Sequence, residues 1–156
     1  MIDKVGALGT NTRTCVMPYD AYLVTIACTT AVGVGCAGSD PLEAADIAGN
    51  YSATTLTVTP PGQPTVDILA AGGILTVVLA TDGSTSGLLS VPAGVNGGTA
   101  INESMIGTFT LNGKVVRFAQ TADTFVRDIE FTVEGRMLRG SGFFSGAVVT
   151  VVLTRG

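Results

Sequence analysis

The chain contains no histidine and no tryptophan, and only 13% of its 156 residues are charged. The lack of histidine excludes Ser-His-Asp triads, Cys-His pairs, histidine-ligated zinc and haem with an axial histidine. Lysines and arginines number 8 against 12 aspartates and glutamates, and no basic run occurs. The resulting net charge of −4 disfavours binding to nucleic acid through its phosphates. We therefore expect no metal, no cofactor and no nucleic-acid partner.

Cysteine is also scarce: Cys15, Cys28 and Cys36 all lie at or before position 36, so the rest of the chain has no disulfide and no thiol site. Residues 21–36 carry no charge but are fewer than the ~20 that a membrane-spanning helix needs. Their length suits the apolar core of an export signal. The alternative interpretation is a buried strand or helix of the folded domain, with ordinary buried cysteines.

The uncharged run ends in the letters GVGC, which resemble the end of a bacterial lipoprotein signal, where a cysteine after a small residue is lipidated. This resemblance implies lipidation at Cys36 and a membrane anchor there. It also implies an exported protein of the cell envelope (an outer-membrane or periplasmic lipoprotein) or of the extracellular space. Because composition changes abruptly after this cysteine, we predict a signal segment over 1–36, a polar tether over 37–46 and a β domain over 47–156.

From residue 47 onward the chain has the pattern of a β meander. β-branched and aromatic residues alternate with small or polar ones, and turn signals recur about every 8–12 residues. Short connections predict sequential antiparallel neighbours, hence an all-β domain closed as an eight-stranded up-and-down barrel; a β-sandwich is the alternative. The predicted strands are 49–59, 74–81, 85–91, 106–111, 114–120, 127–133, 137–143 and 147–154.

Three connections between these strands carry their own expectations. Asn112-Gly113 is the strongest hairpin signal, because both central residues of a type I′ turn need positive φ. The Ala-rich segment 66–73 is either one helical turn or a loop that covers an end of the barrel. The glycine-rich segment 93–104 is predicted to be a mobile loop.

Alternation along the strands points one set of apolar side chains into the barrel. Side chains of an eight-stranded barrel either fill the interior or leave space for one small ligand. Gly107, Gly140 and Gly142 leave room if they face inward, or they permit the coiling that a closed barrel needs. The residues predicted to line or fill the interior are Tyr51, Leu75, Val77, Leu79, Phe109, Val116, Phe118, Ile129, Phe131, Phe144 and Val151.

The letters IAGNY at 47–51 open the first strand with a glycine, any residue and a large aromatic, which resembles the lipocalin-like (calycin) barrels. Tyr51 stands where tryptophan is usual in that family. The letters GTFTL at 107–111, the hairpin after them and the closing strand with Arg155 are similar to small bacterial lipocalin-like lipoproteins. The resemblance implies binding of a small apolar molecule inside the barrel, or of a protein at its rim, without catalysis.

The charged residues of the C-terminal half offer a second candidate site. Arg117 and Glu130 fall on outward faces of neighbouring predicted strands, and we expect them to form a surface pair. Asp128 and Glu130 project to one face of the predicted strand 127–133. Such a carboxylate pair is used to hydrolyse glycosidic bonds, but no cleft is indicated near it, and ordinary surface pairing is the preferred interpretation.

Taken together, these features predict an exported, lipid-anchored and non-catalytic barrel that binds an apolar small ligand. The alternative is a structural or protein-interaction domain at the cell surface, inhibitor-like or self-assembling. Its motivation is the apolar outer face of the last strand, where Val148 and Val152 point away from the interior.

Overall fold

The computed structural model describes residues 41–95 and 98–156. The predicted signal segment, the lipidation at Cys36 and the first part of the tether lie outside the described residues. The last three residues of the predicted tether and Ile47, the first residue of the predicted β domain, form a short helix, α1 (Ala44–Ile47). It starts with a capping box between Glu43 and Asp46. The second helix of the described residues, α2 (Phe125–Asp128), is equally short.

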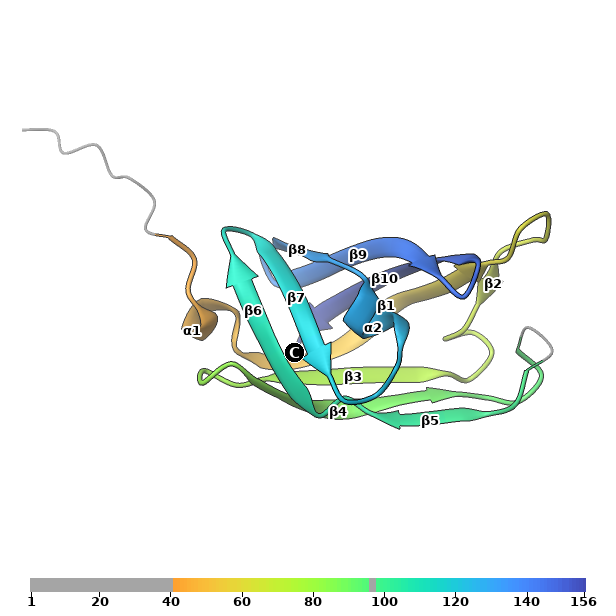
Figure 1. Ribbon diagram of the computed structural model, residues 1–156, viewed down its shortest axis with the longest axis horizontal. Coiled ribbons are helices and arrows are strands. Elements are labelled where there is room, and N and C mark those ends of the chain that lie inside the picture. Colours follow the sequence, from red (N-terminus) through yellow and green to blue (C-terminus); the bar gives the residue numbers. More distant parts are fainter. Residues whose placement is uncertain (1–40, 96–97) are drawn as a thin grey trace, which may run out of the picture. The chain divides into compact units, whose positions relative to one another are not determined.

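The strands are β1 (Gly49–Thr59), β2 (Val66–Asp67), β3 (Ile74–Leu79), β4 (Ser84–Val91), β5 (Ile101–Ser104), β6 (Gly107–Asn112), β7 (Val115–Gln120), β8 (Phe131–Glu134), β9 (Met137–Phe144) and β10 (Ala147–Arg155). Eight of them follow one another around a closed antiparallel barrel in the order β1, β3, β4, β6, β7, β8, β9, β10 (Figure 1). Pairing of β10 with β1 closes the wall, which confirms the barrel over the sandwich.

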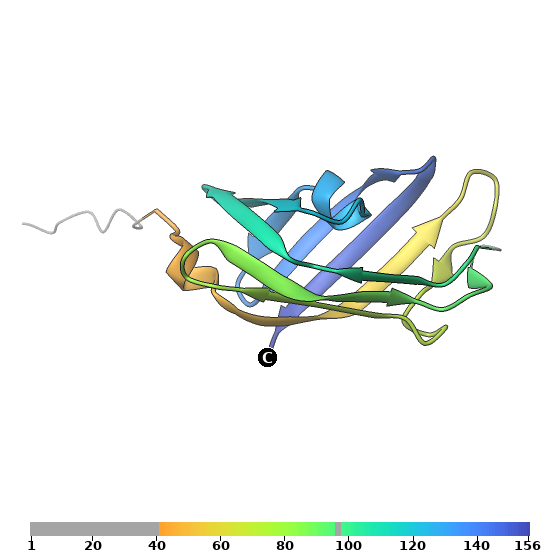
Figure 2. The ribbon, with the colours of Figure 1, turned by 60° about the horizontal axis from the view of Figure 1, so that its bottom comes forward.

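The barrel closes along the pairing of β1 with β10, which runs from Tyr51↔Arg155 to Thr59↔Val148. Figure 2 shows β1 and β10 side by side along this seam. A bulge between Ala53 and Thr55 interrupts the register. Bulges increase the local twist of a strand, and here the bulge lies where β1 passes from its pairing with β3 to its pairing with β2.

The wall is continuous at one end of the barrel and divided at the other. Near its start, β4 pairs with β6 through Ser84 and Thr85, but from Leu88 to Val91 it pairs with the short β5 instead. Likewise β1 pairs with β3 only over Gly49–Ser52. We call the end where β1 begins and β10 finishes the closed end, and the end with the β9–β10 hairpin the open end.

At the closed end, side chains of β1 and β10 donate hydrogen bonds to carbonyls of α1 and of the residue that follows it. The Tyr51 hydroxyl donates to the Ile47 carbonyl at 2.8 Å, and both residues are only 2% exposed. The Arg155 guanidinium donates to the Asp46 and Ala48 carbonyls at 2.8 and 3.2 Å. These contacts attach the segment before β1 to the end of β10, so the two ends of the domain hold each other in place.

Most predicted strands match the structure within one or two residues, and Asn112-Gly113 forms the predicted β6–β7 hairpin. The predicted strand 127–133 is wrong in its first half, where α2 stands in its place and β8 begins only at Phe131. A helical turn buries Phe125, Val126 and Ile129 together, whereas a strand would turn every second side chain outward.

Two connections, 66–73 and 93–104, contain short strands that the sequence did not predict. The segment 93–104 was predicted to be a mobile loop, but its last four residues form β5 on the edge of β4. The segment 66–73 begins with β2 and continues in a turn, with a hydrogen bond from the Gly73 amide to the Ile68 carbonyl at 2.8 Å. Ile68 is 2% exposed and packs into the core, so this segment covers part of the open end.

Candidate ligand-binding site

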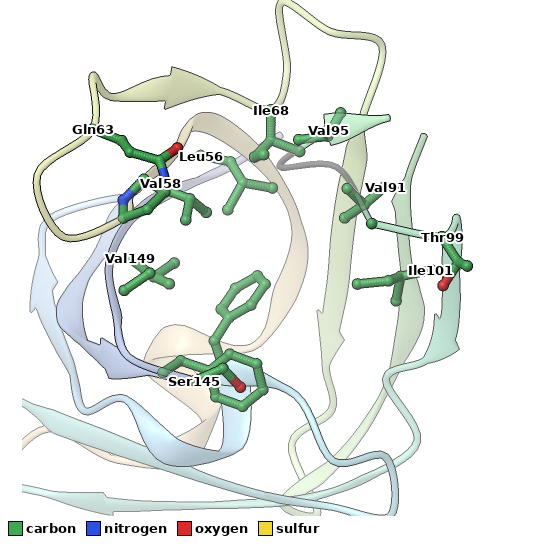
Figure 3. Close-up of a pocket in the computed structure, with 15 residues that line it drawn as sticks. Leu56, Val58, Gln63, Ile68, Val91, Val95, Thr99, Ile101, Ser145 and Val149 are labelled. Carbon is green, nitrogen blue, oxygen red and sulfur yellow. The ribbon is translucent and has the colours of Figure 1, made fainter. Parts of the chain in front are cut away.

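A pocket of about 420 Å³ opens at the open end of the barrel (Figure 3). Its wall combines strand residues of β1, β4, β5, β9 and β10 with the connections between them and with α2. The lining residues are Leu56, Val58, Pro60, Gln63, Ile68, Val91, Val95, Gly98, Thr99, Ile101, Phe125, Phe144, Ser145, Ala147 and Val149.

The pocket has a buried floor and an exposed edge. Leu56, Ile68 and Val149 are at most 2% exposed and form apolar surface inside the barrel, whereas Gln63 and Thr99 are exposed. In Figure 3 the aliphatic side chains surround the cavity, and the polar ones come from the connections at its edge. Concave sites with apolar walls and a few polar groups are typical of small-molecule binding.

Two phenylalanines form one side of the pocket. Phe125 of α2 and Phe144 of β9 meet edge to face, with ring centroids 6.2 Å apart. The β9–β10 turn that follows Phe144 requires positive φ at Ser145 (48°) and Gly146 (81°). Only these two residues separate β9 from β10, and Ala147 pairs with Phe144 across the hairpin.

The divided wall explains why a pocket exists at this end. Because β4 leaves β6 and continues with β5, Val91 and Ile101 face the cavity where a continuous barrel would place two fully paired strands. The shortness of β8 and the helical turn α2 have the same effect on the opposite side, where Phe125 lies. The open end is therefore widened by strand divergence, not by small side chains.

Of the residues predicted to line or fill the interior, the structure places only Phe144 on the pocket wall. The other ten are packed inside the barrel, none more than 6% exposed: Tyr51, Leu75, Val77, Leu79, Phe109, Val116, Phe118, Ile129, Phe131 and Val151. Phe118 and Phe131, for example, pack edge to face at 5.3 Å. These side chains form a solid core beneath the pocket.

The glycines of the interior do not enlarge the cavity. A Cβ on Gly140 would lie 2.8–2.9 Å from side-chain atoms of Ile129 and Phe131, and one on Gly142 would lie 3.0 Å from Ile129. The room beside both glycines is thus already occupied by these two side chains. At Gly107 a Cβ would come within 2.4 Å of the Ala119 carbonyl oxygen, so there the glycine permits close approach of β6 and β7.

The sequence analysis missed most of the pocket residues, although part of the signal was present. Leu56 and Val58 alternate with threonines on β1, and Val149 shares a face of β10 with Val151 and Leu153, so all three were identifiable as inward-facing. Pro60, Ile68 and Thr99 line the pocket because three separate connections come together there. The local sequence of each connection does not predict that arrangement.

The charged residues lie on the outside of the barrel and do not form the second candidate site. Arg117 and Glu130 pair as predicted, with both side chains more than half exposed. The predicted Asp128–Glu130 strand pair is wrong, because Asp128 is the last residue of α2 and its carboxylate pairs with Arg127 at 3.2 Å. Glu130 is engaged by Arg117, so the two carboxylates have separate partners.

In residues 41–95 and 98–156, no three histidine, cysteine, aspartate or glutamate side chains gather as metal ligands. No helix within the same residues has both the length and the apolar character needed to cross a membrane. Comparisons of the chain with protein-family models, curated proteins and solved structures find no match. The lipocalin-like resemblance of the first and middle strands remains a prediction from the sequence.

Proposed function

We propose that this protein is a non-catalytic binding module that holds a small apolar molecule in the open-end pocket. The observation that carries the proposal is the pocket itself, a concave and mainly apolar surface of about 420 Å³ whose floor rests on the packed core. Its volume falls within the roughly 300–1,000 Å³ that is usual for small-molecule sites.

The energetics of such a site favour apolar ligands. Each methylene that a ligand moves from water into the pocket contributes about 0.8 kcal/mol. The floor residues sit on a packed core and on paired strands, so the cavity is formed before the ligand arrives. Preformed sites avoid much of the ordering entropy that binding otherwise costs.

Titration of the full-length chain with 1-N-phenylnaphthylamine, an uncharged apolar dye whose emission rises in apolar sites, tests the proposal. We expect saturable binding that Val58→Trp weakens by about tenfold or more, because an added indole fills space at the pocket wall. Ile74→Trp is the matched control, since Ile74 is 53% exposed on the outer face of β3. Equal dye binding by both folded variants, or no saturable binding to the unmodified chain, contradicts the proposal.

We further propose that the chain is exported and anchored to a membrane by a lipid on Cys36. The GVGC sequence that ends its apolar segment supports this proposal. Expression in a bacterial host and intact mass measurement test this. A mass that starts at Cys36 with added acyl chains supports the anchor. The mass of the unprocessed 156 residues contradicts it.

Self-association is the second candidate function, and exposed apolar side chains favour it. Ile74 and Leu88 are 53% and 45% exposed on the outer face of β3 and β4, and Phe143 is 78% exposed on β9. The outer face of β10, on which the sequence analysis based self-association, supports it less. Val152 is only 6% exposed beside its register neighbours on β1 and β9. Light scattering of the purified chain distinguishes a monomer from an assembly.

A further inference from the structure

The open-end pocket has no charged side chain among its described lining residues. The segments that form its edge, 58–66, 91–95, 98–101 and 143–147, contain no lysine, arginine, aspartate or glutamate. The edge instead offers neutral hydrogen-bonding groups: the amide of Gln63 and the hydroxyls of Thr99 and Ser145.

Three arginines of the described residues, all on the outside of the barrel, already form ion pairs with acidic side chains. Arg127 of α2, two residues after the pocket residue Phe125, pairs with both Asp123 and Asp128. Arg117 pairs with Glu130, and Arg139 with Glu134.

The remaining described cations lie towards the closed end. Arg155 donates to backbone carbonyls before β1, and Arg136 donates to the carbonyls of residues 155 and 156. Lys114 belongs to the β6–β7 turn. No lysine or arginine of the described residues is therefore placed to neutralise an anion in the pocket.

A carboxylate held at the edge of this pocket would lose part of its hydration without gaining a counter-charge. Transfer of an unpaired ion out of water is far more costly than transfer of a hydroxyl or an ester that keeps one hydrogen bond. A cationic head group would meet the same desolvation cost, since no acidic side chain lines the cavity.

We propose that the pocket selects uncharged amphiphiles, such as long-chain alcohols or monoacylglycerols, over fatty-acid anions of the same chain length. The apolar tail lies against the floor formed by Leu56, Ile68 and Val149, and the neutral head stays at the edge with Gln63, Thr99 and Ser145. This inference rests on the proposed function, because it names the ligand class of the same pocket.

Displacement of bound 1-N-phenylnaphthylamine from the full-length chain tests the selectivity. Three competitors share one tail: decanol, decanoate and decyltrimethylammonium, at about pH 8 where the carboxyl group is ionised. We expect decanol to displace the dye at a concentration at least about tenfold lower than either charged competitor. Decyltrimethylammonium distinguishes two causes of selectivity. The protein's net charge of −4 would favour this cation, whereas an uncharged pocket lining would disfavour it as much as decanoate.

A charge placed at the edge sharpens the test. Gln63→Lys is expected to bring decanoate to within a few-fold of decanol, because the added ammonium can pair with the carboxylate. Asn50→Lys, on an exposed position of β1 at the closed end, adds the same charge and is expected to leave the selectivity unchanged.

The outcomes distinguish the two proposals. If the dye binds and decanoate or decyltrimethylammonium competes as well as decanol, the neutral selectivity is wrong while the binding function stands. If the dye does not bind to the unmodified chain, the binding function fails and the selectivity fails with it.

Discussion

The two ends of this barrel are built from the same strands but in opposite ways. At the closed end, Arg155 and Tyr51 donate hydrogen bonds to carbonyls of the segment that precedes β1, and the wall is continuous. At the open end the strands diverge, and uncharged connections surround an apolar cavity. The difference teaches that hydrogen bonds and continuous strand pairing close one end, while the other exposes apolar surface that a ligand can cover.

The largest expected effect is on the core beneath the pocket. Leu153 is fully buried and pairs with Leu138 on β9, so Leu153→Ala should destabilise the fold by about 2–5 kcal/mol. Val149→Ala removes fewer atoms from a wall that already borders a cavity, and should lower stability less but weaken dye binding more. Chemical denaturation and dye titration measure both quantities. Equal losses of stability at the two positions would break the proposed division between the ends.

A smaller effect concerns the closed end at high pH. Burial raises the pKa of the Tyr51 phenol above its ordinary value, with the Arg155 charge acting in the opposite direction. The folded protein then keeps this proton where the unfolded chain loses it, so stability is complete below about pH 10 and falls above it.

Tyr51→Phe tests this contribution. The variant loses the hydrogen bond to the Ile47 carbonyl and should be less stable at neutral pH by about 0.5–1.5 kcal/mol. The stability difference from the parent should shrink as pH rises past 10, measured by denaturation at several pH values. A difference that stays constant over this range would show that Tyr51 does not titrate with folding.

The smallest effect is expected beside the pocket. The Thr124 hydroxyl, just before Phe125, is buried and has no hydrogen-bond partner among the described residues. Thr124→Val keeps the shape and removes this unsatisfied group, so stability should be unchanged or increase by up to about 1 kcal/mol. A clear loss of stability in thermal unfolding would mean that the hydroxyl has a partner in solution.

The accuracy of the sequence predictions followed the range of the interactions involved. Alternation along β3, β7 and β10 and the positive φ needed at Gly113 are local, so the strands and the β6–β7 hairpin were predictable. The helical turn at 125–128 was not, because a run of apolar and charged residues this short fits either period and only packing on β7 and β9 decides between them.

By itself the sequence determined the all-β class, the number of barrel strands and a set of interior side chains, because residue alternation and turn chemistry act between near neighbours. The tertiary structure alone decided which interior positions are filled and where space remains. Ile129 and Phe131 occupy the room beside Gly140, while β4 diverges from β6 at the other end and leaves the cavity. Packing volume and strand divergence involve residues far apart in the chain, so they emerge only when the wall has closed.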